Sequence, residues 1–268
     1  LGDVYKRQVM VPAASIPGSV SRVEHLPFRV EIASAEQMDG VIQLRTASYG
    51  KHLPDLGAKL REAEPADFAP GCEVFVATSK LDGSVLGTLR THANCVDAIP
   101  LQYSLKLPQR FRGSRMVETT RLCVKGNPNS SLVRSALFKA LHSYCLAQGV
   151  DWMLATGRRP VDRIYDSLYF SDVGEAGMFY PMTFTGGVPH RVMYLAPQAV
   201  QPLWHAAQHA LHDFFFATQH PDIDLSRAKP IAQPWLCPEP DAPQSAQDDS
   251  LPLPTHAEQW APSAAMAL

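Results

Sequence analysis

The chain has 268 residues, 46% of them hydrophobic, and a formal net charge of −2 at pH 7. This length suits one large domain or two small ones, and the composition allows a full hydrophobic core. The near-neutral charge argues against a general nucleic-acid binder. No apolar run reaches the roughly 18 residues that a membrane-spanning helix needs. We therefore expect no nucleic-acid partner and no integral membrane protein.

The five cysteines are odd in number and widely spaced, without a CxxC pair or a zinc pattern: Cys72, Cys95, Cys123, Cys145 and Cys237. Reduced thiols in a cytoplasmic protein are the simplest interpretation. The first residues, "LGDVYKRQ", lack an initiator methionine and resemble translated sequencing-adapter text. Residues 1–9 are therefore a candidate artefact, and Met10 is the expected start. Pro12 and Pro17 interrupt the apolar segment that follows, so we expect no secretory signal.

The first predicted elements are a strand, a helix and a hairpin. Residues 28–33 alternate as a strand does, and Ser34 is a good N-cap for a helix over 35–50. A polar loop that contains prolines follows. Two alternating runs, 72–79 and 85–92, flank "KLDG". Two such runs around Asp-Gly are a strong signal of a β-hairpin.

A second series of strands and helices follows. Residues 116–124 are predicted as a fourth strand, and the apolar residues of 130–149 share one face of a helix. A short apolar strand, a helix, a late strand and a further helix complete the series, at 151–157, 159–170, 190–197 and 197–219. This order predicts one mixed α/β sheet in a single domain.

The composition changes near Lys229. Eight prolines fall between Pro230 and Pro262, and no Lys or Arg follows Lys229. Such a composition does not support a core. The expected organisation is an N-terminal extension, one domain and a disordered, proline-rich acidic tail, over 1–27, 28–229 and 230–268.

Four short motifs occur in order, each within an expected element: Arg45 in "QLRTASY", Glu64 and Asp67 in "EPADF", Arg90 in "LGTLR", and Glu118, Thr120 and Arg121 in "ETTR". With the element order over about 28–196, they resemble GNAT-fold acyltransferases. Within that fold they resemble the N-acyl amino acid synthases of the FeeM type and the related acyl-homoserine-lactone synthases. The lactone synthases usually carry a tryptophan-containing segment between the first arginine and the acidic pair. Residues 51–63 contain no tryptophan, which favours the amino acid synthases.

The resemblance implies a mixed, mostly antiparallel sheet flanked by helices, whose fourth and fifth strands splay apart around the pantetheine arm of a donor. It implies an N-acyltransferase that moves a fatty acyl group from the thioester of an acyl carrier protein to the α-amine of an amino acid. Acyl-phosphopantetheine or acyl-CoA is then a substrate, and no bound cofactor or metal is expected. Three alternatives stay open: an acyl-homoserine-lactone synthase, an acetyltransferase that uses acetyl-CoA, and a non-catalytic module that binds an acyl carrier protein.

Glu118 is the predicted general base. An amino acid's amine is an ammonium at neutral pH, and a positioned carboxylate can take its proton directly or through water. On an alternating strand Glu118, Thr120 and Leu122 share one side and Thr119 and Arg121 the other, unless a bulge changes this facing. The alternative is that Glu118 and Arg121 simply pair at a sheet edge.

Arg45, Arg90 and Arg121 are candidates for binding the acceptor's carboxylate, because a planar guanidinium can hold both oxygens. A buried arginine also needs a partner. Internal pairing with Asp67 or Glu64 is therefore an equal alternative. The two interpretations are compatible if an Arg–Asp pair shapes the substrate-binding pocket.

The loop after the fourth strand is the predicted donor site. Members of the GNAT fold usually hold the pyrophosphate of coenzyme A with glycine-rich amides at a helix N-terminus. Here Gly126 is the only glycine of that loop. This suits the single phosphodiester of a carrier protein better than a pyrophosphate with a nucleotide. The expected donor-binding residues are Cys123, Val124, Lys125, Asn129, Ser130 and Ser131.

A basic surface should steer such a carrier protein, whose own surface is acidic. No acidic residue occurs between Asp97 and Glu118, where several cations are found. The expected carrier-binding residues are Lys106, Arg110, Arg112, Arg115 and Arg134. The alternative for each of them is an ordinary solvated surface.

Two further patterns have simpler explanations. His205, His209 and His212 lie on one predicted helix and could ligate a metal, but an ordinary helix surface is the stronger interpretation. Cys123 could carry a covalent acyl group. Direct attack by the amine is the habit of the family, so we expect a small apolar strand residue instead.

Overall fold

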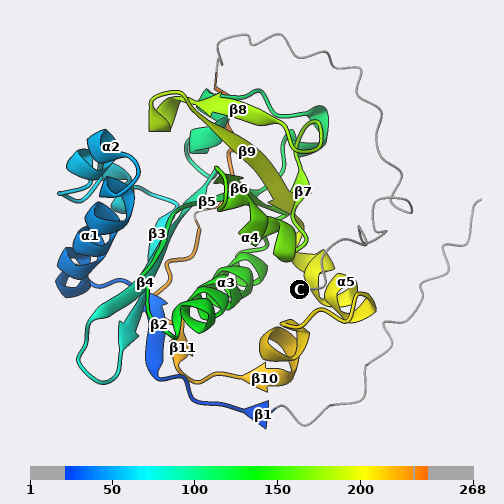
Figure 1. The fold of residues 1–268 in the computed structure, drawn as a ribbon. Helices are drawn as coiled ribbons and strands as arrows, with labels where there is room; N and C mark the ends of the chain where they lie inside the picture. The colour runs from blue at the N-terminus through cyan, green and yellow to red at the C-terminus, as the bar shows by residue number, and fades with distance from the viewer. Residues whose placement is uncertain (1–21, 232, 241–268) are drawn as a thin grey trace, which may run out of the picture.

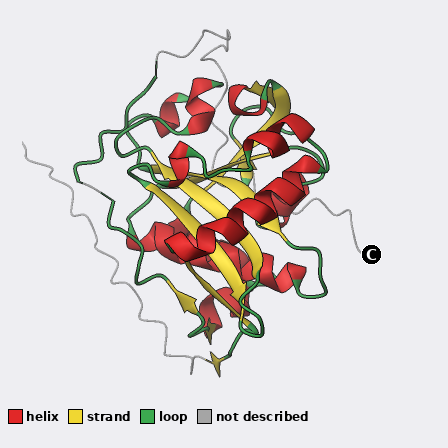
Figure 2. Cartoon of the chain, turned by 90° about the vertical axis from the view of Figure 1, so that its left-hand side faces the viewer, coloured by secondary structure: helices red, strands yellow, loops and turns green. Residues whose placement is uncertain are grey.

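A computed structural model describes residues 22–231 and 233–240 (Figure 1). The expectations for residues 1–21 and 241–268, including the start at Met10 and the last part of the tail, lie outside the described residues. The described chain forms one large mixed sheet with helices on both of its faces (Figures 1 and 2). This arrangement confirms the expected fold class.

The large sheet has nine strands among the described residues, in the order β11–β2–β3–β4–β5–β6–β9–β7, with β8 also paired to β9. Their bounds are β2 Phe28–Ile32, β3 Cys72–Ser79, β4 Val85–Ala93, β5 Met116–Val124, β6 Trp152–Gly157, β7 Ser171–Asp172, β8 Phe179–Met182, β9 Val188–Leu195 and β11 Ile223–Asp224. Neighbours from β2 to β5 are antiparallel, β5 and β6 are parallel, and β6 and β9 are antiparallel. The predicted hairpin is β3–β4.

Five α-helices occur in the described residues: α1 Ala35–Gly50, α2 Pro54–Lys59, α3 Ser130–Ala147, α4 Asp162–Ser167 and α5 Val200–Ala206. Side chains alternate along β3, so its two faces support different helices. Val74 packs with Val41 of α1, whereas the Phe75 ring meets Tyr144 of α3 at 5.5 Å on the other face. None of these helices combines the length and apolarity that a membrane span requires.

The helices and strands in the second half of the chain are shorter and more numerous than the sequence predicts. The helix expected over 197–219 is wrong in extent, because α5 ends at Ala206 and is followed by Gln208 with a φ of 49°. A left-handed residue ends a helix by turning the chain out of its axis. The strand expected at 190–197 begins earlier, at Val188, because β8 pairs with it as a hairpin that the sequence analysis missed.

The packed chain continues past Lys229, where the tail was expected to begin. β10 (Thr218–Gln219) pairs with β1 (Arg22–Val23), and β11 pairs with β2 at the edge of the large sheet. Ile231 is then buried in the core around α3, with its N–H donating to Gln148 at 2.9 Å. Farther on, the Leu236 N–H donates to the Cys95 carbonyl at 3.0 Å. The domain therefore includes the described residues up to 240.

We predict that Ile231→Ala lowers the free energy of unfolding by about 2–3 kcal/mol, because it removes buried methyl groups and leaves a cavity. Leu236→Ala is the matched control, since the Leu236 side chain is 63% exposed and exposed substitutions usually change stability by about 0.5 kcal/mol or less. Urea denaturation of both variants and the parent measures the difference. Equal stabilities of all three proteins would return the boundary to Lys229.

Candidate acyl-transfer site

The pairing of β5 and β6 ends before the strands do. Their register runs from Met116 opposite Trp152 to Thr119 opposite Ala155, yet β5 continues to Val124 and β6 to Gly157. The two strands therefore diverge over their last residues. This is the splay that the resemblance implied between the fourth strand of the series and the next.

A cavity of about 190 Å³ occupies the divergence. It is lined from α1 and the turn after it by Ser48, Tyr49, His52 and Leu53; from β5 by 119–123; from β6 and the turn after it by 156–158; and from the elements beyond by Val161, Tyr165, Phe184, Thr185 and His190. Tyr165 belongs to the core around α3, whereas Tyr49 lies on α1 across the sheet. The cavity is thus open to groups from both faces of the sheet.

Arg121 sits at a bulge in β5. Between the pairs Arg90–Thr120 and Thr88–Cys123, three residues of β5 span the length of two residues of β4, and Arg121 has a φ of 55°. The extra residue turns the Arg121 side chain toward the α1 face, where it meets Glu64. It also turns Leu122 into the core around α3. The facing expected for a regular strand therefore does not hold at Arg121 and Leu122, because β5 contains the kind of bulge that the sequence analysis named as able to change it.

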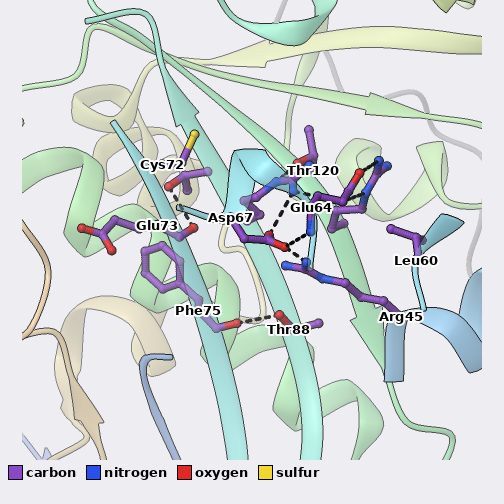
Figure 3. Close-up of polar contacts among 12 residues, drawn as sticks. Arg45, Leu60, Glu64, Asp67, Cys72, Glu73, Phe75, Thr88 and Thr120 are labelled. Carbon is purple, nitrogen blue, oxygen red and sulfur yellow. Dashed lines mark hydrogen bonds and ion pairs between the residues drawn. The ribbon is translucent and has the colours of Figure 1, made fainter. Parts of the chain in front are cut away.

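The four sequence motifs meet in one buried ion cluster (Figure 3). Arg45 of α1 and Arg90 of β4 both donate to Asp67 Oδ1, at 2.8 and 2.9 Å. Glu64 accepts from Arg90 at 2.9 Å and from Arg121 at 2.6 Å. The expected internal pairing is therefore present. Because three arginines share two carboxylates, the cluster keeps one positive charge in excess.

Two guanidinium nitrogens of this cluster are buried without a partner. Among the described residues, neither Nε nor Nη2 of Arg45 has a hydrogen-bond acceptor. An unmet buried donor costs free energy. Of the three arginines, Arg121 is the one whose side chain lines the cavity. An anion in the cavity would therefore meet Arg121 before it met Arg45 or Arg90.

His92 extends the cluster and was missed by the sequence analysis. Arg90 Nε donates to His92 Nε2 at 3.0 Å, so the imidazole proton lies on Nδ1 and points to the Cys72 sulfur at 3.3 Å. Burial, followed by the charges of Arg90 and Arg121, lowers the pKa of His92 to about 3. This histidine is a neutral support of Arg90. Strand alternation could have found it, because His92 lies two residues after Arg90 on the same face.

Glu118 is sealed in the protein and is not among the residues that line the cavity. Its side chain is 0% exposed, and its Oε2 accepts the Leu101 N–H at 2.8 Å. Its Oε1 has no partner in the described part of the chain. Burial raises the pKa of Glu118 to about 8, although the Leu101 N–H, Arg90 and Arg121 oppose the shift. The alternative ion pair with Arg121 is not formed, because Arg121 pairs with Glu64.

The predicted donor residues separate into two places. Cys123 lines the cavity, and burial raises the pKa of its thiol to about 11, so it is not a thiolate nucleophile at neutral pH. Lys125 instead lines a groove between α1 and the β3–β4 turn. Asn129 precedes α3 without a side-chain capping bond. Val124, Ser130 and Ser131 do not reach the cavity wall.

The predicted carrier-binding cations do not surround the cavity either. Arg115 precedes β5 and pairs with Asp151 at 2.9 Å, and Arg112 pairs with Glu239 at 3.1 Å. Arg110 donates to the Val173 carbonyl. Since β5 has nine residues, its start lies roughly 30 Å from the loop at its end. The structure therefore separates Lys106, Arg110, Arg112 and Arg115 from Arg134, which is on α3.

No group of three or more His, Cys, Asp or Glu side chains is arranged to hold a metal ion within residues 22–231 and 233–240. His209, one of the three histidines considered as metal ligands, packs instead against Trp204, and the two rings stack with centroids 4.1 Å apart.

The ion pairs of Glu64 should make the free energy of unfolding depend on pH in the acid range. Burial alone would raise its pKa, but the Arg121 hydrogen bond and the charges of Arg90, Arg121 and Arg45 lower it from 4.5 to about 2. A lowered folded-state pKa gives stability that is present above pH 4.5 and lost as the pH falls toward 2. We predict that Glu64→Gln costs about 3 kcal/mol at neutral pH and that the deficit shrinks across this window.

Denaturant titrations at several pH values test this prediction. Glu62→Gln is the matched control, because Glu62 is exposed and makes no ion pair within the described residues. A deficit for Glu64→Gln that stays constant down to pH 2 would show that the carboxylate charge is not the source of the stabilisation.

Three comparisons place this geometry among known proteins. A family model for the N-acyl amino acid synthase FeeM matches residues 41–185, and no curated protein matches the sequence. The solved structure of FeeM, an N-acyl amino acid synthase from uncultured soil microbes, has a TM-score of 0.51 at 14% identity, over 70% of this chain and 99% of FeeM. That superposition shows the fold.

Two further structures are more distant. The CoA-dependent acyl-homoserine lactone synthase BjaI with MTA has a TM-score of 0.47 at 15% identity, over 74% of this chain and 95% of BjaI. An acetyltransferase of the GNAT family from Staphylococcus aureus Mu50 has a TM-score of 0.45 at 11% identity, over 63% of this chain and 99% of its own. The family match itself spans more than half of the chain. The chain therefore belongs to the FeeM family of N-acyl amino acid synthases and is an acyltransferase with the GNAT fold.

Proposed function

We propose that this protein transfers a fatty acyl group from the thioester of an acyl carrier protein to the α-amine of an amino acid. The observation that carries the proposal is the cavity between the diverging strands β5 and β6, which meets the positively charged ion cluster at Arg121. A thioester needs a slot between the strands, and an amino acid needs a cation for its carboxylate. The cavity offers both within one space.

The donor's carbonyl would lie against β5 beyond Thr119. There β5 no longer pairs with β6 among the described residues, so backbone N–H groups on this edge can donate to a thioester oxygen. Fixed donors aimed at a developing oxyanion are a large source of rate enhancement. Cys123 supports this wall as a buried neutral thiol. Holding amine and thioester together would supply the remaining orientation effect.

The acceptor's carboxylate would bind Arg121. Its guanidinium already holds Glu64 through Nε and Nη2, and the excess positive charge of the cluster favours a further anion. Arg45 and Arg90 are buried behind it and share Asp67. On this proposal they set the position and charge of Arg121 and do not contact the acceptor directly.

A carrier protein remains the proposed donor because the loop between β5 and α3 has one glycine, Gly126. The structure suggests a different docking surface from the sequence. Arg158 lines the cavity, and Arg159 and Arg163 beside it are exposed. These cations flank Val161, an exposed residue at the cavity's edge, so an acidic carrier protein could approach the cavity there.

Two groups compete for the role of proton acceptor. Glu118 is the candidate from the sequence and could act through water. His190 is the second, because it is one of two histidines that line the cavity among the described residues.

Mass spectrometry tests the proposal most directly. In the first experiment the purified protein is incubated with a carrier-bound long-chain acyl thioester and a panel of amino acids. In the second, lipid extracts of a bacterium that expresses the protein are compared with extracts of a vector control. N-acyl amino acids are the expected products. A homoserine lactone formed from S-adenosylmethionine, or acetyl transfer from acetyl-CoA alone, would replace the proposal. Carrier binding without any product would identify a non-catalytic module.

We predict that Arg121→Gln reduces the preference for an amino acid over its amide by roughly 10- to 100-fold in kcat/KM, the effect of losing a hydrogen bond to a charged group. The amide lacks the carboxylate and should be affected less. Arg29→Gln, an exposed change on β2, is the control for lost positive charge. An unchanged preference in Arg121→Gln would remove Arg121 from acceptor binding.

Charge reversal distinguishes the two carrier surfaces. We expect Arg159→Glu with Arg163→Glu to weaken carrier binding by about tenfold or more and to reduce its salt dependence. Arg112→Glu tests the surface predicted from the sequence, and we expect a smaller effect. The reverse ranking would place the docking surface at the start of β5. If neither reversal matters and acetyl-CoA is the better donor, the carrier proposal is wrong.

A further inference from the structure

We infer that His190 is the catalytic residue that takes the proton from the acceptor's ammonium. This inference rests on the proposed function and adds a residue to it. It comes from the position of the imidazole, from the hydrogen bond that fixes its tautomer, and from the chemistry of the other cavity walls.

His190 lies on the acceptor side of the sheet. On β9 it shares a face with Val192, which packs in a second hydrophobic cluster with Leu101 and Met116. Glu118 accepts the Leu101 N–H on that same face, which is the face of the ion cluster. The imidazole therefore lines the part of the cavity that the acceptor would enter.

One hydrogen bond fixes which nitrogen of His190 is free. Nδ1 lies 2.8 Å from the Val188 carbonyl oxygen. A carbonyl can only accept, so Nδ1 carries the proton and Nε2 keeps its lone pair. In the described chain Nε2 has no hydrogen-bond partner. It is not fully buried either, unlike Oε1 of Glu118. It is therefore an accessible proton acceptor.

Burial, helped by a nearby cation, keeps His190 neutral. Burial lowers its pKa; the Val188 hydrogen bond opposes this, and Arg158 lowers the pKa further. Phe184 faces the ring with centroids 6.1 Å apart, and Arg121 lies on the β5 wall of the same cavity. A neutral imidazole at pH 7 is the form that a general base needs.

The other cavity walls offer few competitors. Among the described residues that line the cavity there is no carboxylate. Burial raises the pKa of Tyr49, Tyr165 and the Cys123 thiol, which therefore stay protonated. His52 lies at the exposed rim, and no hydrogen bond within the described chain fixes its ring. Glu118 is sealed and holds its own proton up to about pH 8.

The step balances without another reactant. The ammonium gives one proton to His190 Nε2, and the amine's lone pair attacks the thioester carbonyl carbon to form the C–N bond. The C–S bond then breaks, and the sulfur keeps its electron pair. The thiolate takes the second proton of the attached nitrogen, and the imidazolium returns its proton to water. The products are the amide, the free thiol and one proton.

The experiment compares pH profiles of kcat/KM for the parent, His190→Gln and Glu118→Gln, with a carrier-bound acyl thioester and the best amino acid. Gln can still donate to the Val188 carbonyl but is not a base. We expect His190→Gln to lower kcat/KM by about 10²- to 10⁴-fold and to lose the rising limb of the profile. In the parent that limb should lie below the ordinary histidine value of about 6.5. His205→Gln, an exposed change on α5, should match the parent.

Each other outcome has one meaning. The rising limb of the parent's kcat/KM profile could instead lie near pH 8 and be lost in Glu118→Gln, while His190→Gln stays close to the parent. That result would identify Glu118 as the proton acceptor and overturn the inference. If His190→Gln unfolds, His190→Ala with added imidazole replaces it. Activity restored by imidazole supports the inference. A folded His190→Ala variant whose activity imidazole does not restore overturns it. A parent that acylates no amino acid would instead refute the proposed function.

Discussion

The ion cluster between α1, β4 and β5 is the interaction on which the rest of the site depends. Asp67 holds Arg45 and Arg90, and Glu64 holds Arg90 and Arg121, so each carboxylate joins two separate elements. Both carboxylates come from the short 3₁₀ turn region before β3. Guanidinium groups removed from water must find such partners. The cluster therefore fixes a polar loop across the sheet and sets the position of the cavity wall that carries Arg121.

A second constraint acts within β5. The strand pairs with β4 on both sides of the bulge but leaves β6 after Thr119. A bulge adds a residue to one strand and increases its local twist, which suits a strand that turns away from its neighbour. The same extra residue brings Arg121 to the ion cluster and Leu122 into the core. One local irregularity thus serves both the opening of the cavity and the orientation of its cation.

Charge pairing could be predicted from the sequence, whereas register could not. Arg45 and Arg90 stand among apolar neighbours, and a buried arginine needs a partner, so internal pairing with Asp67 or Glu64 was one of two equal expectations, and the structure shows it. The bulge at Arg121 depends on how two strands align, which no single segment records. The burial of Glu118 depends on an irregular segment around Leu101. His190 reaches the cavity through the β8–β9 hairpin, which the sequence analysis did not detect.

The excess positive charge also bears on the chemistry of the acceptor. Three arginines share two carboxylates, and two nitrogens of Arg45, Nε and Nη2, lack an acceptor among the described residues. A carboxylate bound at Arg121 would offset that charge. An amino acid therefore gains a charge-assisted hydrogen bond that an amine without a carboxylate lacks. The cations next to it also disfavour the ammonium form and lower the pKa of the acceptor's amine. The bound ammonium is then a stronger acid than it is in water, so a neutral imidazole nearby, such as His190, removes its proton more easily. With the cluster present, binding the carboxylate and releasing the proton favour the same substrate.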